Sequence, residues 1–193
     1  MRIKAFIPTT AIFVMVIAYA CNLSSAKPGG QQISQDSLIK RGAYLVAISG
    51  CNDCHTPKLM TAMGPVLDTS KILSGYRSEV KPNEVSVDAF EKGWVLFNNE
   101  QTSLATPGFT SFAPNITSDA TGIGAWTYEQ FKRAFTQGKW KGQEGSRTLL
   151  PPMPWQSYAA MVDEDVQAVF EYLKSTKPVE NVAPAPVFAA KNK

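Results

Sequence analysis

The sequence has few of the residues from which many active sites are built. Among 193 residues there is one histidine, His55, and there are three cysteines, Cys21, Cys51 and Cys54. A single histidine argues against a metal site built from several histidines. It also disfavours a Ser-His-Asp triad, because no other histidine is available for that role. Three cysteines are too few for a scaffold of disulfides.

Neither sign of charge dominates the chain. There are 19 lysines and arginines and 16 aspartates and glutamates, which give a formal net charge of +3. Such a balance excludes a strongly basic nucleic-acid-binding protein, so no nucleic-acid partner is expected. Apolar residues make up 44% of the sequence and charged residues 18%. The chain can therefore bury a core, and its length favours one domain or at most two small ones.

The first 20 residues have the layout of a secretory signal peptide. Arg2 and Lys4 precede an apolar run over residues 11–20, which is too short to span a bilayer. A helix of the folded core is the less favoured alternative. A signal peptide directs the mature chain to the bacterial periplasm.

Cys21 follows the triplet Ala18-Tyr19-Ala20, which fits the recognition sequences of two different signal peptidases. The context resembles a bacterial lipobox, in which the cysteine becomes the lipidated first residue, although Ala18 stands where leucine is usual. The same triplet fits an ordinary A-x-A cleavage site. Lipidation is favoured because Cys21 is otherwise a spare thiol. Residues 21–35 are a polar, flexible tether of the kind that holds an anchored domain off a membrane.

Three later stretches have the apolar periodicity of helices, and no stretch alternates convincingly as a strand does. They are residues 36–48, 127–137 and 163–174. The second has a capping box formed by Thr127 and Gln130 and ends at Gly138. Gly42 lowers the stability of the first helix, which indicates a close packing contact at that position.

The remaining segments are rich in turn-forming residues. Residues 56–112 contain scattered prolines, glycines and aromatics and are predicted to be mostly loop, with a short helix within 86–93. Residues 179–193 are rich in proline, alanine and lysine and are predicted to be a disordered tail. The folded domain is therefore expected to span residues 36–178.

Two of the cysteines and the histidine form one motif, Cys51-Asn52-Asp53-Cys54-His55, of the form C-x-x-C-H. Two thiols three residues apart can form thioethers with the vinyl groups of a haem, and the following imidazole can then bind the iron. A thioredoxin-like site lacks its βαβ neighbourhood, a zinc site lacks a fourth ligand, and a disulfide leaves His55 without a role. The motif therefore indicates one covalently attached haem c.

A low-spin haem of this kind usually takes a sixth ligand, and methionine is the remaining candidate because there is no second histidine. Met60 and Met63 follow His55 so closely that the chain would be stretched almost to its limit to reach the opposite haem face. Met153 lies among prolines whose stiffness suits a weak thioether ligand. Packing in the core is the alternative role for Met153 and is equally open to Met161.

Several motifs, in their order along the chain, resemble those of class I cytochromes c. They are Arg41-Gly42-x-Tyr44-Leu45-Val46, the C-x-x-C-H motif, Gly64-Pro65, Pro114-Asn115-Ile116-Thr117, Gly122-Ile123-Gly124-Ala125-Trp126-Thr127, Pro152-Met153-Pro154-Trp155 and Phe170-Glu171-Tyr172-Leu173-Lys174. The chain looks most similar to the cytochrome domains found with periplasmic alcohol and aldehyde dehydrogenases, and to their single-haem relatives. Those subunits carry several C-x-x-C-H motifs, whereas this chain has one.

The resemblance implies an all-α cytochrome c fold, with helices wrapped around one covalently bound haem. Residues 79–112 form a long loop-rich insert, whose aromatic side chains either offer an apolar surface to a partner in a complex or cover the haem. The first helix, around Gly42, would cross the last, around Phe170. The backbone carbonyl of Pro65 would accept a hydrogen bond from Nδ1 of His55. Four side chains would face the haem or its propionates, with core packing or exposure as the alternative for each: Tyr76, Arg77, Trp126 and Trp155.

These observations favour an electron carrier whose haem iron has both axial positions filled, by His55 and Met153. A haem-based gas-binding or catalytic protein with a labile sixth ligand is one alternative. An obligate cytochrome subunit of a dehydrogenase or oxidase complex is the other. The expected partners are membrane or periplasmic redox proteins, and a membrane contacted through a lipid on Cys21.

Overall fold

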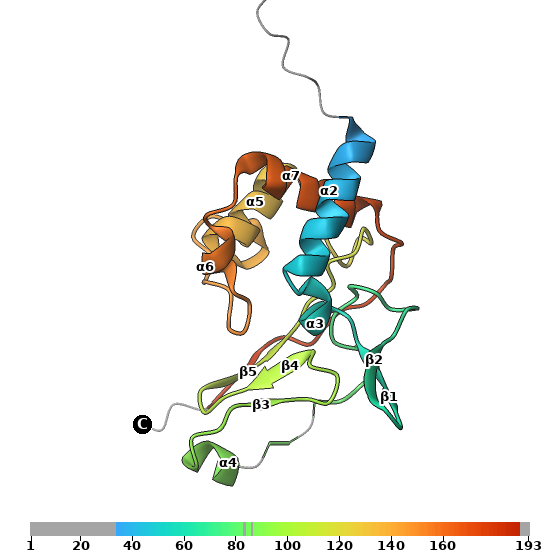
Figure 1. Cartoon of the computed structure of the whole chain (residues 1–193). Helices are drawn as coiled ribbons and strands as arrows, with labels where there is room; N and C mark the ends of the chain where they lie inside the picture. Colours follow the sequence, from blue (N-terminus) through green and yellow to red (C-terminus); the bar gives the residue numbers. More distant parts are fainter. Residues whose placement is uncertain (1–33, 83, 86, 190–193) are drawn as a thin grey trace, which may run out of the picture. The chain divides into compact units, whose positions relative to one another are not determined.

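The computed structural model in Figure 1 describes residues 34–82, 84–85 and 87–189. The predicted signal peptide, Cys21 and the tether as far as Ile33 lie outside the described residues. Within the described part of the chain, no helix combines the length and the apolar character needed to cross a membrane.

Seven short helices are described: α2 (Gln35–Ile48), α3 (Cys51–His55), α4 (Val87–Glu91), α5 (Tyr128–Gln137), the 3₁₀ helix η2 (Trp140–Gly142), α6 (Trp155–Tyr158) and α7 (Asp163–Ser175). α2, α5 and α7 confirm the three predicted helices to within a residue at each end. The hydroxyl of Ser34 caps α2, and that of Thr127 caps α5. Gly138 ends α5 in a left-handed conformation, as predicted from its position.

The expectation of an all-α fold is wrong, because the structure contains two antiparallel sheets. β1 (Lys58–Thr61) pairs with β2 (Gly64–Leu67). The second sheet has the order β3-β4-β5-β6, formed by Leu96–Phe97, Ser103–Ala105, Phe109–Phe112 and Val187–Phe188. These strands have two to four residues, too few for an alternating pattern to be recognised in the sequence. They form because backbone groups of the loop-rich segment need partners.

The prediction of a disordered tail is wrong for residues 179–189, which make specific contacts in the structure, and residues 190–193 lie outside the described residues. The backbone oxygen of Val179 accepts a hydrogen bond from Asn115 Nδ2 at 2.7 Å. Asn181 is buried, and β6 forms the edge of the second sheet beside β5. The order of this segment comes from partners far away in the sequence, so its own composition did not reveal it.

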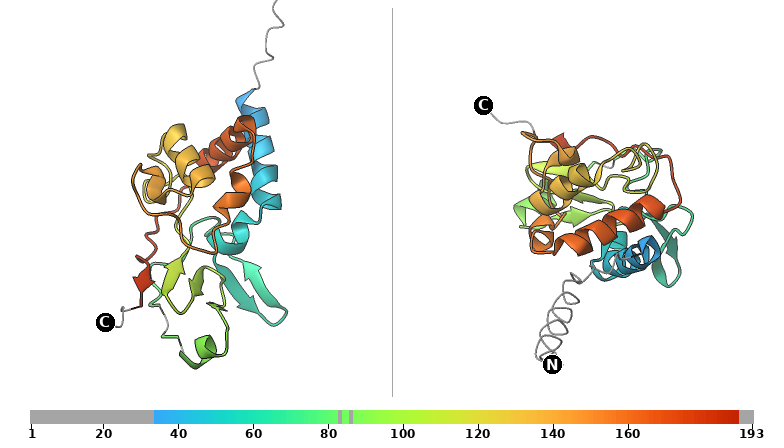
Figure 2. Two further views of the ribbon diagram at one scale, coloured as in Figure 1. Left: turned by 90° about the vertical axis from the view of Figure 1, so that its left-hand side faces the viewer. Right: turned by 90° about the horizontal axis from the view of Figure 1, so that it is seen from above.

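The core lies where α2, α5, α6 and α7 meet, and Figure 2 shows α2 and α7 side by side in both views. A Cβ atom on Gly42 would lie 1.9 Å from the backbone oxygen of Ala168 in α7, which confirms the predicted close contact. Aromatic rings continue the core from α7 to α6, with Phe131 5.4 Å from Phe170 and Phe135 4.5 Å from Tyr158 between ring centroids. This apolar frame supports α3, which follows α2 directly.

Candidate functional site

The C-x-x-C-H motif forms the short helix α3, which begins immediately after a sharp turn from α2. Gly50 makes this turn in a left-handed conformation with φ of 67°, which glycine adopts without strain. Cys51 and Cys54 are half-buried and do not form a disulfide. Burial raises the pKa of the Cys51 thiol to about 11 and also raises that of Cys54. Both are therefore protonated thiols at neutral pH, which argues against a nucleophilic or thiolate-dependent site.

His55 is held with its ring in one orientation. The side chain is only 7% exposed, and Nδ1 lies 2.8 Å from the backbone oxygen of Pro114. A carbonyl oxygen can only accept, so Nδ1 carries the proton and Nε2 keeps its lone pair. Burial lowers the pKa of His55, which favours this neutral form. No hydrogen bond to Nε2 is found among the described residues, so this atom is available as a metal ligand.

The expectation that Pro65 accepts this hydrogen bond is wrong. Pro65 lies in β2, where it pairs with Met60 across the hairpin. The partner of His55 is Pro114, which lies just after β5 and also stands in one of the motifs of the resemblance. Nothing in the local sequence distinguishes the two carbonyls, because the choice depends on which loop folds back over α3.

A segment around Gly75 holds the Pro114 loop against α3. The amide of Gly75 donates to the backbone oxygen of His55 at 2.7 Å, and the amide of Tyr76 donates to that of Ala113 at 2.9 Å. A Cβ atom on Gly75 would lie 2.4 Å from the Ala113 oxygen, and φ is 82°. Only glycine fits this position, a role that its sequence context does not reveal.

Two further side chains support α3 and were also missed. Thr56 is fully buried, and its hydroxyl donates to Asn52 Oδ1 at 2.7 Å and accepts from the amide of Leu73 at 2.8 Å. Lys58 is 7% exposed, and its ammonium donates to the backbone oxygen of Asp53. A cation at the end of a helix stabilises its unpaired carbonyl groups. Their position directly after the motif is the one signal that could have identified them.

The four candidate methionines fall into two pairs. Met60 and Met63 lie on the β1–β2 hairpin and are 60% and 96% exposed, so neither is oriented toward the core. Met153 and Met161 are half-buried and pack against the same apolar cluster that Cys51 contacts. Of the four, Met153 and Met161 therefore pack inside the domain, and a methionine ligand to haem iron stays a prediction.

The loop that carries Met153 is attached to the rest of the site on both sides. Before Met153, the hydroxyl of Ser111 in β5 donates to the backbone oxygen of Pro151 at 2.7 Å. After it, the hydroxyl of Tyr158 in α6 donates to the backbone oxygen of Ser49, next to α3, at 3.2 Å. These contacts bring the Met153 loop to the same end of the molecule as the C-x-x-C-H helix.

Strand β5 supports both of these loops at once. Ser111 lies within it, and the chain leaves it at Ala113 to reach Pro114, whose oxygen accepts from His55. One strand thus positions the segment before Met153 and the carbonyl that orients His55. Tyr158 completes this support, and burial raises its pKa to about 12, so its hydroxyl remains a donor at physiological pH.

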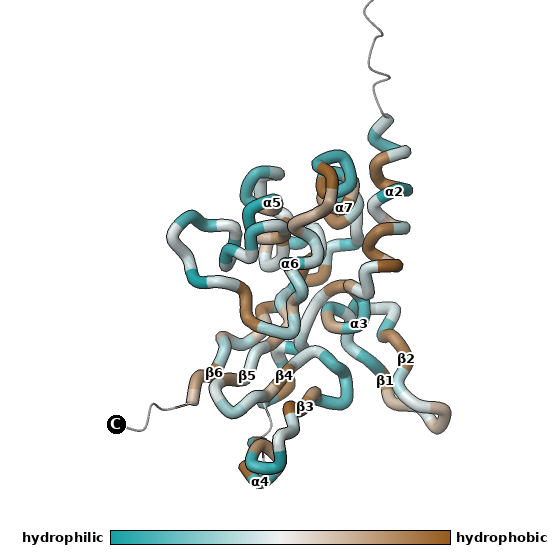
Figure 3. The backbone as a smooth tube through the Cα atoms, turned by 60° about the vertical axis from the view of Figure 1, so that its left-hand side comes forward, coloured by the Kyte–Doolittle hydropathy of each residue, from teal (hydrophilic) through white to brown (hydrophobic). Residues whose placement is uncertain are grey.

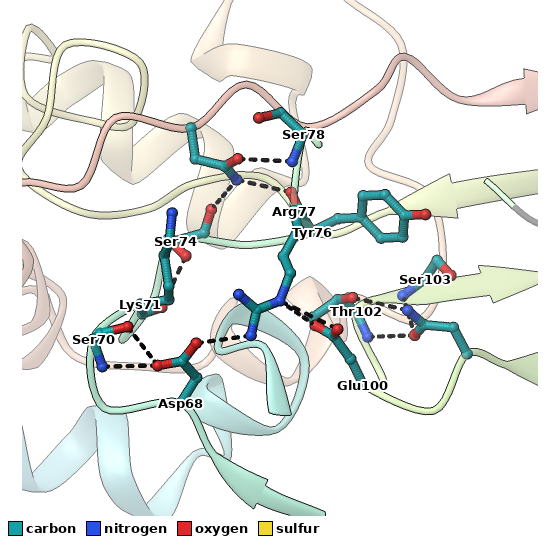
Figure 4. Close-up of polar contacts among 12 residues, drawn as sticks. Asp68, Ser70, Lys71, Ser74, Tyr76, Arg77, Ser78, Glu100, Thr102 and Ser103 are labelled. Atoms are coloured by element: carbon teal, nitrogen blue, oxygen red, sulfur yellow. Dashed lines mark hydrogen bonds and ion pairs between the residues drawn. The ribbon is translucent and has the colours of Figure 1, made fainter. Parts of the chain in front are cut away.

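The four side chains expected to face a haem all have partners within the protein. Trp126 packs against the apolar core, and the ring of Trp155 lies against Gly138. Tyr76 is buried edge-on against Phe112, with the ring centroids 4.8 Å apart. Figure 4 shows Arg77 paired with two carboxylates, at 2.8 Å from Asp68 and 3.1 Å from Glu100. These contacts account for each side chain, and haem contact remains a prediction for all four.

The donor set fits a haem c better than a bare metal ion. Two unlinked thiols lie on one short helix, and the neighbouring imidazole offers Nε2 while Nδ1 is occupied. In the described part of the chain, no group of three or more His, Cys, Asp or Glu side chains could hold a metal ion. A macrocycle that supplies four nitrogen ligands of its own requires only the two axial residues from the protein.

Comparison with known proteins gives relatives among the dehydrogenases. No family model matches the chain. It is 31% identical over 140 residues to the gluconate 2-dehydrogenase cytochrome c subunit of Pantoea cypripedii, which is 72% of this chain and 23% of that protein. One of the subunits of nicotinate dehydrogenase from Pseudomonas putida is 39% identical over 170 residues, 88% of this chain and 11% of the relative.

A third relative is the cytochrome c subunit of a quinone alcohol dehydrogenase from Komagataeibacter europaeus. It is 30% identical over 148 residues, which is 76% of this chain and 24% of that subunit. The chain therefore spans about a quarter or less of the length of these curated relatives.

Proposed function

The chain is a cytochrome c related to the cytochrome c subunits of dehydrogenases, and we propose that it transfers electrons through one haem c bound covalently to Cys51 and Cys54. The observation that carries this proposal is the hydrogen bonding of the His55 ring. Its Nδ1 is fixed by the Pro114 oxygen at 2.8 Å, and its Nε2 keeps a lone pair beside two unlinked thiols.

Each of the candidate residues would have a different role in holding the haem. Cys51 and Cys54 would form the two thioethers, and His55 would bind the iron through Nε2 while Pro114 prevents rotation of the ring. Met153 would be the second protein ligand to the iron and would leave no free coordination site for a substrate. Haem supplies one-electron chemistry, and a methionine ligand favours its reduced state.

Covalent attachment is tested by extracting the mature protein with acidified acetone. The colour should stay with the polypeptide, and the mass should exceed that of the processed chain by one haem. Cys51→Ala and Cys54→Ala should each weaken attachment and destabilise the domain, because a core built around haem is left with a large cavity. Transfer of all the haem into the organic phase would refute the proposal.

The identity of the sixth ligand decides between a carrier and a gas-binding or catalytic protein. Met153→Ala should abolish the weak far-red band of the ferric protein, lower the reduction potential and admit carbon monoxide to the ferrous iron. Met161→Ala is the matched control, since both methionines are half-buried against the same cluster, and it should leave all three properties unchanged. If the native ferrous protein binds carbon monoxide rapidly, the gas-binding alternative takes precedence.

The same proposal places the cytochrome in the periplasm, anchored through lipid on Cys21, with a dehydrogenase or oxidase as its redox partner. The relatives named as subunits of dehydrogenases support that class of partner. Wild-type protein should partition into membranes, whereas a Cys21→Ser variant should be freely soluble or remain unprocessed. Soluble wild-type protein with an unmodified Cys21 would favour the A-x-A cleavage site instead.

A further inference from the structure

The charges of this chain are unevenly distributed. Residues 132–147 hold five of the 19 lysines and arginines but only one of the 16 acidic residues, Glu144. The remainder of residues 34–189 carries nine basic and fifteen acidic residues. A local excess of positive charge therefore stands in a domain that is otherwise acidic.

Four of these five cations have no ion pair among the described residues. Lys132 pairs with Asp163. The other four, Arg133, Lys139, Lys141 and Arg147, have no carboxylate within ion-pair distance in the part of the chain that the structure describes. We call these four residues the basic surface.

The basic surface is one compact feature, because Arg133 lies in α5, Lys139 between α5 and η2, Lys141 in η2 and Arg147 in the loop after η2. Arg133 donates from Nε to the backbone oxygen of Gly142 at 2.8 Å. The guanidinium of Arg147 lies 4.1 Å above the ring of Trp140. Lys139 pairs through its backbone with Thr148.

The surroundings of the basic surface are polar. The large exposed apolar side chains among the described residues lie elsewhere, and none belongs to residues 132–149. Figure 3 shows largely hydrophilic colours over α5 and the loop beside it. A surface that enters a membrane would expose apolar side chains among its cations, so these observations favour a protein partner over a lipid surface.

The basic surface adjoins the Met153 loop. The amide of Leu149 donates to the backbone oxygen of Gly138 at 2.7 Å, which joins the end of this basic segment to the end of α5. The ring of Trp155, two residues after Met153, packs against the same Gly138. A partner bound to the cations would therefore lie beside the segment that carries the proposed sixth ligand.

We propose that the basic surface is the docking site for an acidic face of the protein that exchanges electrons with this cytochrome. The inference rests on the proposed electron transfer function. Opposite charges on two proteins speed their encounter and fix their relative orientation, while charges far from the contact contribute little at physiological salt.

The test uses the haem-loaded full chain and two small oxidants of opposite charge. One electron passes from the ferrous haem to ferricyanide, which becomes ferrocyanide, or to tris(phenanthroline)cobalt(III), which becomes the cobalt(II) complex. Stopped-flow absorption measures both rates at low and at high ionic strength. Ferricyanide should react faster as salt is lowered, although the described domain carries more acidic than basic residues.

The variants separate a local effect from one of net charge. Lys139→Glu/Lys141→Glu changes two residues of the basic surface, and Lys40→Glu/Lys81→Glu makes the same change in net charge at exposed lysines elsewhere. The first variant should slow ferricyanide by about tenfold at low salt and speed the cobalt complex, and the second should change either rate less than twofold.

Equal slowing in both double variants would overturn the proposal, since it would show an effect of net charge alone. Unchanged rates in the first variant would overturn it as well. Binding of the lipid-free Cys21→Ser protein to phosphatidylglycerol vesicles, lost in Lys139→Glu/Lys141→Glu, would assign the surface to lipid instead. None of these outcomes resembles failure of the proposed function, in which there is no covalent haem and no absorption change to follow.

Discussion

The helical part of the domain and the strand-bearing part are held together by different forces. α2, α5 and α7 meet through apolar side chains, with Val46, Val166 and Val169 almost completely buried. The segments from Asp68 to Phe112 also bury apolar side chains such as Leu73 and Phe112, but they add a network of buried charged and polar groups. The site depends on both parts. Helix α3 follows α2 of the helical part, whereas the hydrogen-bond partners that His55 and Thr56 find outside α3 come from the strand-bearing part.

The polar part has two centres, which Figure 4 shows together. Arg77 joins Asp68 to Glu100, with side chains that are 15%, 10% and 23% exposed. Asn181, from the C-terminal segment, donates from Nδ2 to the backbone oxygens of Ser74 and Tyr76 at 2.6 and 2.8 Å. Both centres hold the segment around Gly75 that supports the Pro114 loop, so polar contacts determine how firmly His55 is oriented.

The largest effect should come from breaking the apolar part at its closest contact. Gly42→Ala would place a Cβ atom 1.9 Å from the backbone oxygen of Ala168, so α2 and α7 must separate. We expect a loss of about 3 kcal/mol in the free energy of unfolding, at the upper end for overpacking. Denaturation monitored by circular dichroism measures it.

Gly108→Ala is the matched control for that experiment, because no atom lies within 4 Å of its added Cβ. It should change the free energy of unfolding little. If the two variants were equally stable, the close crossing of α2 and α7 would not be what holds the helical part together.

A smaller and more local effect is expected from Arg77→Met in the polar part. The change leaves two largely buried carboxylates without their cation, which in a fully buried site costs about 3–5 kcal/mol. Because these side chains keep some contact with water, we expect about 2 kcal/mol. Hydrogen exchange should become faster in β3, β4 and residues 68–78 and stay unchanged in α5 and α7.

Arg147→Met serves as the control for Arg77→Met, since Arg147 lies over the ring of Trp140 and has no carboxylate partner among the described residues. It should not alter exchange in the strands. Uniformly faster exchange throughout the domain after Arg77→Met would show that the two parts unfold together, and the comparison between them would then fail.

The same division explains what the sequence could predict. The helical part follows from local signals: the periodicity of α2, α5 and α7, the caps at Thr127 and Gly138, and the adjacent residues of the C-x-x-C-H motif. The resemblance of its motifs to dehydrogenase-associated cytochromes c is confirmed by the relatives that are named as cytochrome c subunits of dehydrogenases.

The polar part could not be predicted in this way, because its contacts join residues far apart in the chain. His55 finds Pro114 rather than Pro65 at a separation of 59 residues, and Asn181 finds Ser74 at a separation of 107. Strands of two to four residues are stabilised by such contacts and not by a pattern of their own. Local signals alone indicate the helices, but neither the strands nor the order of residues 179–189.

The smallest effect should come from the ion pair of the helical part, Arg41 with Asp165. It is bidentate, and its distances of 2.9 and 3.1 Å are similar to those of the Arg77 pairs. However, the Arg41 side chain is 51% exposed, and water screens the interaction. Arg41→Leu should therefore change the denaturation midpoint at neutral pH by little more than the error of the measurement, far less than Arg77→Met.

The pH dependence of that small effect has a definite sign. The Arg41 guanidinium lowers the pKa of Asp165 below its ordinary value of 3.8, so the folded state favours the carboxylate. The stabilisation is complete above that ordinary value and is lost as the pH falls through the lower pKa of the folded protein. Any difference between wild type and Arg41→Leu should vanish on acidification. A difference at neutral pH as large as that of Arg77→Met would show that geometry, and not burial, determines the strength of ion pairs in this domain.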